Sequence, residues 1–125
     1  MILPTWERRI ACLGALVGLA GVALSAAAAH WVGTGNVDTA ARFLLVHAPA
    51  LIGIACLSAT GLAHLWAART AGILMGLGLL LFCGDLTVRE LYGVAPFRMA
   101  APTGGILLMA GWLALALSAV LPRRD

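Results

Sequence analysis

The sequence predicts an all-α polytopic membrane protein, a compact bundle of four transmembrane helices that forms one domain over residues 1–125. Of these residues, 62% are hydrophobic and only 10% are charged, whereas a soluble domain carries roughly 25% charged residues. The apolar residues form four segments, each close to the ~20 residues that span the hydrocarbon core of a bilayer. Backbone groups in lipid must be satisfied internally, so each segment should be an α-helix.

The first predicted helix covers about residues 10–32 and follows the positively charged pair Arg8-Arg9. Its charged start, apolar centre and run of alanines at 26–29 also resemble a secretory signal peptide, but we interpret it as a retained helix. A turn at Gly33-Thr34-Gly35-Asn36 precedes the second predicted helix, which covers about residues 43–68.

The third predicted helix covers about residues 71–95 and follows a break at Arg69-Thr70. A loop from Gly93 to Pro102 leads to the fourth, which covers about residues 103–121. Pro102 suits the first turn of that helix, where its missing N–H has no cost, and Pro122 ends it.

The arginines predict the orientation in the membrane. One side of the predicted bundle carries five arginines, Arg8, Arg9, Arg69, Arg123 and Arg124. The other side carries Arg42 and Arg98. The positive-inside rule places both termini in the cytoplasm. Trp6 and Trp66 then lie at the inner interface, with Trp31 and Tyr92 at the outer one.

Small residues predict how the helices pack. Gly14 and Gly18 form a G-x-x-x-G pattern, as do Gly72 and Gly76. Such residues let helix backbones approach closely, either within the bundle, which we favour, or across a homodimer face. The three cysteines, which form no C-x-x-C pair, are expected to be small buried core residues: Cys12, Cys56 and Cys83.

Polar residues in the apolar segments are the candidate functional residues, because ionisable groups in lipid are costly. At 1.5 Å per residue, Asp85 lies about 24 Å from Arg69 along the third helix, and Arg89 lies near the outer surface. The same count puts His47 about 8 Å below Arg42, level with Asp85 and slightly below His30. We therefore predict a polar pocket in the outer third of the bundle, made by His30, His47, Asp85 and Arg89.

Two interpretations of this pocket remain open. Asp85 and Arg89 are spaced i, i+4, which suits a purely structural ion pair, and Glu90 on another face would pair with Arg42 or face water. Alternatively, His30 and His47 could ligate a haem or a metal, or relay protons. Two histidines make an incomplete zinc site, so no metal site is predicted and the cofactor stays unknown. No nucleophile–base set or phosphate loop occurs, so no catalytic residue is assigned.

Four short motifs in order along the chain resemble the YgdD-like family of small four-helix inner-membrane proteins. Its G-A-F-G-A-H motif corresponds to residues 25–30, its aromatic-H-x-L-A-L run to 46–51, and its F-S-G-S-L-Y motif to 82–87. Its T-P-x-G-G…G-W signature corresponds to Ala101, Pro102, Thr103, Gly104, Gly105, Gly111 and Trp112. The resemblance implies a bacterial inner-membrane location and the fold above, and it implies no reaction. Asp85 stands where the family has serine.

The function predicted is that of a small, non-catalytic accessory or interaction subunit of a membrane complex. The alternative is ligand, haem or metal binding, or proton relay, at the outer pocket. The expected partners are the lipid bilayer and, through the small-residue faces, other membrane subunits or a second copy. The net charge of +3 is scattered, which does not suit nucleic-acid binding.

Overall fold

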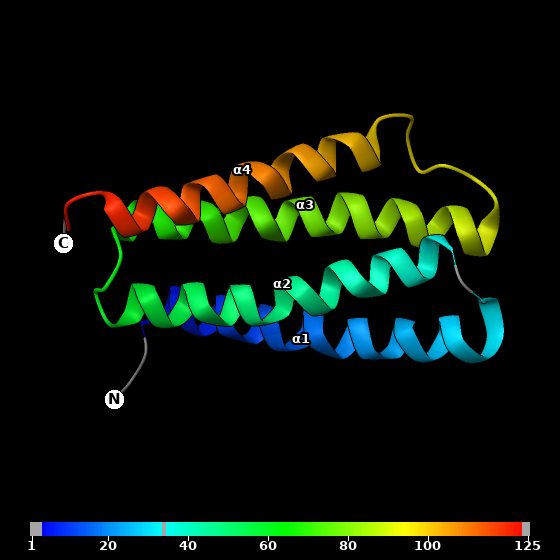
Figure 1. Ribbon diagram of the computed structural model, residues 1–125, viewed down its shortest axis with the longest axis horizontal. Coiled ribbons are helices and arrows are strands. Elements are labelled where there is room, and N and C mark those ends of the chain that lie inside the picture. Colours follow the sequence, from blue (N-terminus) through cyan, green and yellow to red (C-terminus); the bar gives the residue numbers. More distant parts are fainter. Residues whose placement is uncertain (1–3, 34, 124–125) are drawn as a thin grey trace.

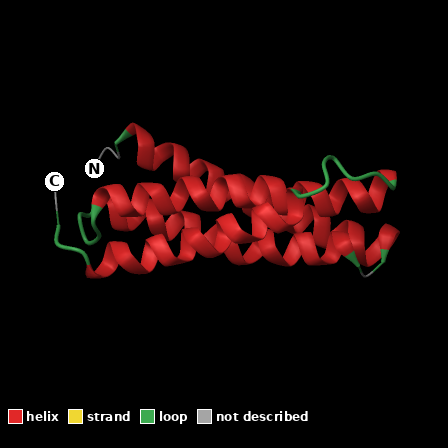
Figure 2. Ribbon diagram, turned by 90° about the horizontal axis from the view of Figure 1, so that it is seen from above, coloured by secondary structure: helices red, strands yellow, loops and turns green. Residues whose placement is uncertain are grey.

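The computed structural model describes residues 4–33 and 35–123, and within them it confirms the predicted bundle of four membrane-length helices. The helices are α1 (Thr5–Ala27), continued by one π-helical segment η1 (Ala28–Val32), then α2 (Asn36–Ala59), α3 (Leu65–Tyr92) and α4 (Ala100–Val120). They run alternately up and down, so α1 begins and α4 ends at the same end of the bundle (Figure 1). Figure 2 shows the loops at the two ends of the bundle, and the one at the right-hand end runs back alongside the helices.

The boundary between the second and third helices differs from the predicted one. Helix α2 begins at Asn36 and ends at Ala59, and Arg69 lies within α3. Gly61 adopts a positive φ of 67° just after α2, a conformation that a glycine adopts without strain. The His64 side chain then caps α3 by accepting from the Ala67 N–H. Apolar neighbours of these two residues hide the turn from a hydropathy reading.

Glycines bring the helices together in two hairpins, α1 with α2 and α3 with α4. A Cβ on Gly14 would lie 3.0 Å from the Ala48 carbonyl oxygen of α2. A Cβ on Gly104 would lie 2.5 Å from the Phe82 backbone nitrogen of α3. The predicted role of the small residues in packing within the bundle is therefore confirmed at these contacts.

The two hairpins meet along α2 and α3, where Leu51, Ile54 and Met75 are completely buried. Side-chain hydrogen bonds add to this contact. Among the described residues, every side-chain hydrogen bond between distant parts of the chain joins one hairpin to the other. They are Arg69 with Glu7, Cys83 with the Ala40 carbonyl, and Trp112 with His47. Lipid supplies no hydrophobic drive between helices, so such polar contacts contribute to association.

The cysteines are only partly as expected. Cys83 is buried and its thiol donates to the Ala40 carbonyl oxygen at 3.6 Å. Cys12 and Cys56 are exposed, so the expectation of three core cysteines is wrong for these two. Both lie on outward faces of their helices, and hydropathy alone does not separate an outward face from an inward one when lipid surrounds the protein.

Candidate functional site

The Asp85–Arg89 ion pair is the centre of the candidate site near the C-terminal end of α3. The Arg89 Nε donates to Asp85 Oδ2 at 2.7 Å, as the i, i+4 spacing predicts. Asp85 is only 2% exposed, and its second oxygen, Oδ1, is buried with no hydrogen-bond partner among the described residues. Arg89 is 39% exposed. The pair therefore leaves one acceptor inside the protein and the terminal amino groups of Arg89 at its surface.

His47 belongs to a different contact, which joins α2 to α4. Its Nδ1 lies 2.7 Å from the Phe43 carbonyl oxygen, and its Nε2 accepts from the Trp112 Nε1–H at 3.0 Å. An indole N–H can only donate, so Nε2 carries a lone pair and Nδ1 carries the proton. Both nitrogens of this neutral, buried histidine are thus in use. His47 has no free nitrogen for a metal or a haem in this arrangement.

The four predicted pocket residues do not form one cluster. Phe82 contacts Phe43 with ring centroids 4.5 Å apart, so Asp85 lies beyond Phe43 and His47 lies deeper, towards the other end. The equal depth predicted for His47 and Asp85 is wrong because α2 begins at Asn36, before Arg42. His30 is exposed in η1 and takes part in no hydrogen bond found among the described side chains.

Glu90 is exposed, as one of its two predicted surroundings requires, and it does not pair with Arg42. Arg42 instead pairs with Asp38 on its own helix, Nε to Oδ2, at 3.0 Å. Glu90 lies against the start of α2, where a Cβ on Gly35 would be 3.5 Å from its Oε1. A carboxylate near a helix N-terminus interacts favourably with the partial positive charge there. The C-terminal end of α3 therefore lies next to Gly35, the residue that precedes α2.

A second buried ion pair, at the opposite end of the bundle, was missed by the sequence reading. Glu7 is 1% exposed, and its Oε1 accepts from Arg69 Nη2 at 3.1 Å. The Arg69 guanidinium carbon lies 5.3 Å from the Trp6 ring centroid and 5.9 Å from that of Trp66. Both distances suit cation–π attraction. The partners are 62 residues apart in the sequence, so no local spacing predicts this pair. The one local signal is Glu7 itself, an acid directly before Arg8-Arg9 at the start of an apolar helix.

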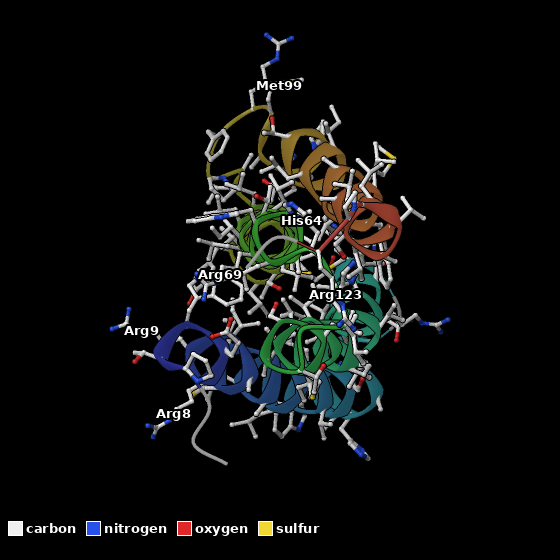
Figure 3. The ribbon with its side chains drawn as sticks, turned by 90° about the vertical axis from the view of Figure 1, so that its left-hand side faces the viewer. Arg8, Arg9, His64, Arg69, Met99 and Arg123 are labelled. Atoms are coloured by element: carbon white, nitrogen blue, oxygen red, sulfur yellow. The ribbon has the colours of Figure 1, made fainter. Side chains whose placement is uncertain are left out.

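The end that carries this pair is the more basic one. Figure 3 views that end and labels Arg8, Arg9, Arg69 and Arg123. Arg8 and Arg9 belong to α1, Arg69 belongs to α3, and Arg123 follows α4. Arg124 lies outside the described residues. At the opposite end, Arg42 and Arg89 each pair with an acid on their own helix, and Arg98 takes part in no ion pair among the described residues.

The residues of the proline-glycine-tryptophan signature are structural in this fold. Pro102 lies in the first turn of α4, as predicted. Gly104 and Gly111 allow α4 to touch α3, since a Cβ on Gly111 would lie 2.7 Å from Met75 Cγ. Gly105 is less crowded, with Phe82 Cδ2 at 4.0 Å from its hypothetical Cβ. Trp112 donates to His47. Their roles are thus contact between α3 and α4 and attachment of α4 to α2.

An apolar groove runs along the outside of the bundle between α1 and α3, with α2 contributing Leu44. Its volume is about 370 Å³. We call it the α1/α3 groove. Its lining is almost entirely aliphatic or small: Leu13, Val17, Leu24, Leu44, Gly76, Leu79, Leu80, Cys83, Gly84, Thr87 and Val88.

The polar groups of the described chain form ion pairs and hydrogen bonds between neighbouring residues. Over residues 4–33 and 35–123, no three His, Cys, Asp or Glu side chains gather in a way that could hold a metal ion. Each buried ion pair joins an acid to an arginine, and His47 is occupied on both sides. Among the described residues, the buried side-chain atoms without a hydrogen-bond partner are single oxygens on Glu7, Asp85 and Ser58.

Comparison with known proteins agrees with the membrane fold. The chain is 30% identical over 115 residues to the UPF0382 membrane protein YwdK of Bacillus subtilis (strain 168), which covers 86% of this chain and 93% of that relative. No solved structure matches the chain. Residues 24–105 match the family described as "Protein of unknown function (DUF423)". This multi-pass membrane protein therefore belongs to that uncharacterised family.

Proposed function

We propose that the protein is a non-catalytic accessory or interaction subunit of a membrane complex, and that it binds a transmembrane helix of a partner in the α1/α3 groove. The observation that carries the proposal is Gly84, a groove residue. A Cβ at this position would meet no atom within 4 Å. Glycine costs roughly 1 kcal/mol relative to alanine inside a helix. No residue of the described chain packs so closely against Gly84 that a glycine is needed there. We therefore assign this glycine to a close contact with another molecule.

The composition of the groove supports a helix as the occupant. Gly76 and Gly84 lie two turns apart on α3, with Leu80 between them. Small residues at this spacing let a second backbone approach, and close approach is what stabilises helix pairs in lipid. None of the described residues that line the groove is charged, so an apolar transmembrane segment can enter it without an unpaired charge becoming buried.

Site-specific photocrosslinking tests the proposal. Leu13 lines the groove and is 36% exposed, whereas Leu16 is 56% exposed and lies outside it. A photoreactive residue at Leu13 should give one protein adduct in native membranes, and the same residue at Leu16, the matched control, should not. Leu13→Trp should fill the groove and abolish co-purification of that partner, which Leu16→Trp should retain. Equal adducts at both positions, or lipid adducts alone, would reject the groove as a helix-binding surface.

We also propose that the protein lies in the bacterial inner membrane with both termini in the cytoplasm. The resemblance to the YgdD-like proteins supports the location, and the arginines at the end shown in Figure 3 support the orientation. Green fluorescent protein fused to either terminus should fluoresce, since it folds in the cytoplasm, and alkaline phosphatase fused there should be inactive. Phosphatase inserted between Gly93 and Met99 should be active. The reverse pattern of activities would overturn the orientation.

A further inference from the structure

A small cavity next to Asp85 lies between α3 and the chain that leads into α4. Its volume is about 190 Å³, and Asp85 is the only charged residue of the lining, which is otherwise apolar: Leu80, Leu81, Gly84, Val88, Pro96, Phe97 and Ala100. Oδ1 of Asp85 is buried without a partner. An unsatisfied buried acceptor is costly, so a hydrogen-bond donor that reached this oxygen would be stabilised. The Asp85 side chain is 0% exposed, so the residues that cover it must move apart for a donor to enter.

The position of α4 places this cavity at the level where lipid headgroups begin. Gly104 contacts Phe82, and α4 starts only one turn before Gly104, at Ala100. Asp85 therefore lies beside the first turn of α4, although α3 itself continues for about two more turns beyond it (Figure 1). In the first turn of α4, the Ala100 N–H donates to the Phe97 carbonyl and Pro102 has no N–H, so among the described residues the Ala101 N–H still needs a partner, and hydrocarbon offers none. The start of α4, and Asp85 with it, must therefore lie within reach of polar groups.

Arg89 provides the opposite charge next to this cavity through its ion pair with Asp85, although it does not line the cavity itself. Its hydrogen bond to Asp85 uses only Nε, and the side chain is 39% exposed. Within the described chain no other acid lies within ion-pair distance of it. The two terminal amino groups are thus available to a phosphate, which arginine binds well through its several donors. The Asp85–Arg89 pair has no net charge. A bound group with one positive and one negative charge would therefore add no net charge to the site.

From this geometry we propose that the cavity binds the headgroup of a phospholipid that carries a primary ammonium, as ethanolamine phospholipids do. The ammonium N–H donates to Asp85 Oδ1, and the phosphate accepts from the terminal amino groups of Arg89. The apolar lining, including Phe97, contacts the lipid below its headgroup. A choline headgroup has no N–H and cannot donate, and an anionic headgroup without an ammonium leaves Oδ1 unsatisfied. The polar groups of this site, Asp85 and Arg89, do not line the α1/α3 groove, so the inference does not require the proposed partner helix, although Leu80, Gly84 and Val88 line both the groove and the cavity.

A headgroup methylation series tests the site on the unaltered protein. The purified protein in mild detergent is titrated, by native mass spectrometry, with lipids of identical acyl chains whose headgroups are ethanolamine, monomethyl-ethanolamine, dimethyl-ethanolamine and choline. One charge-assisted hydrogen bond corresponds to about a tenfold change in affinity. We expect ethanolamine lipid to bind about tenfold more tightly than choline lipid, with the largest drop where the last N–H is lost. Equal affinities across the series would overturn the proposal.

Substitutions then connect the preference to the cavity. Asp85→Asn keeps the size of the side chain but removes its charge, and it should reduce the preference for ethanolamine over choline lipid to about onefold. Glu90→Gln is the matched control, since it removes an acid from the same end of α3 that does not line the cavity, and it should keep the preference. Free phosphoethanolamine should bind far more weakly than the lipid. A preference that survives in Asp85→Asn, or equal binding of free phosphoethanolamine, would reject the lipid site.

Discussion

Replacing Gly104 with alanine is expected to destabilise the bundle by about 3 kcal/mol, the upper part of the usual range for an overpacked site. The added Cβ would lie 2.5 Å from the Phe82 nitrogen and 2.8 Å from the Gly78 carbonyl oxygen. Both are backbone atoms of a continuous helix, so no side-chain rotation relieves the clash. Helices α3 and α4 must separate, which also weakens their other contacts. The loss is measured as a lower melting temperature of the purified protein in detergent.

Gly84→Ala is the matched control for this prediction, because it makes the same chemical change in α3. No atom lies within 4 Å of the added Cβ, and alanine is favoured over glycine in a helix by roughly 1 kcal/mol. Gly84→Ala should therefore leave the melting temperature unchanged or raise it slightly. If both variants melted at the same temperature, the contact between α3 and α4 would not depend on Gly104.

The number and type of helices could be predicted because hydropathy and length determine them in a membrane. The position of the second turn could not be predicted in the same way. Gly61 and His64 form it within residues as apolar as a transmembrane segment, and Arg69-Thr70 offers a more polar break nearby. In the structure, Arg69 can lie inside a helix because Glu7 and two tryptophan rings surround it. Tertiary contacts of this kind are not visible in a local pattern.

The candidate site could be predicted where its contacts are local. The i, i+4 spacing predicts the Asp85–Arg89 pair, and the structure contains it. The relative depth of residues on different helices depends on where each helix begins, so one displaced boundary separated His47 from Asp85. Trp112 was noted for its sequence motif, but its hydrogen bond to His47 depends on how α4 packs against α2. Partners 65 residues apart require the fold itself.

Arg69→Met should destabilise the protein by about 3 kcal/mol, since removal of one partner leaves a buried charge uncompensated. Glu7 is 1% exposed, and its only ion-pair partner among the described residues is Arg69. We place the effect at the lower end of the usual range because Arg69 itself is 26% exposed. The melting temperature in detergent measures the loss. Arg42→Met is the control, because the Arg42–Asp38 pair is more exposed and should contribute little.

The double variant Glu7→Gln/Arg69→Met separates the cost of an unpaired charge from the loss of packing. It removes both charges, so it should recover most of the stability that Arg69→Met loses. What it does not recover is the contact of the guanidinium with the rings of Trp6 and Trp66. A double variant as unstable as Arg69→Met would mean that Arg69 acts through these rings, and that α1 is attached to α3 by aromatic packing without a contribution from the Glu7 carboxylate.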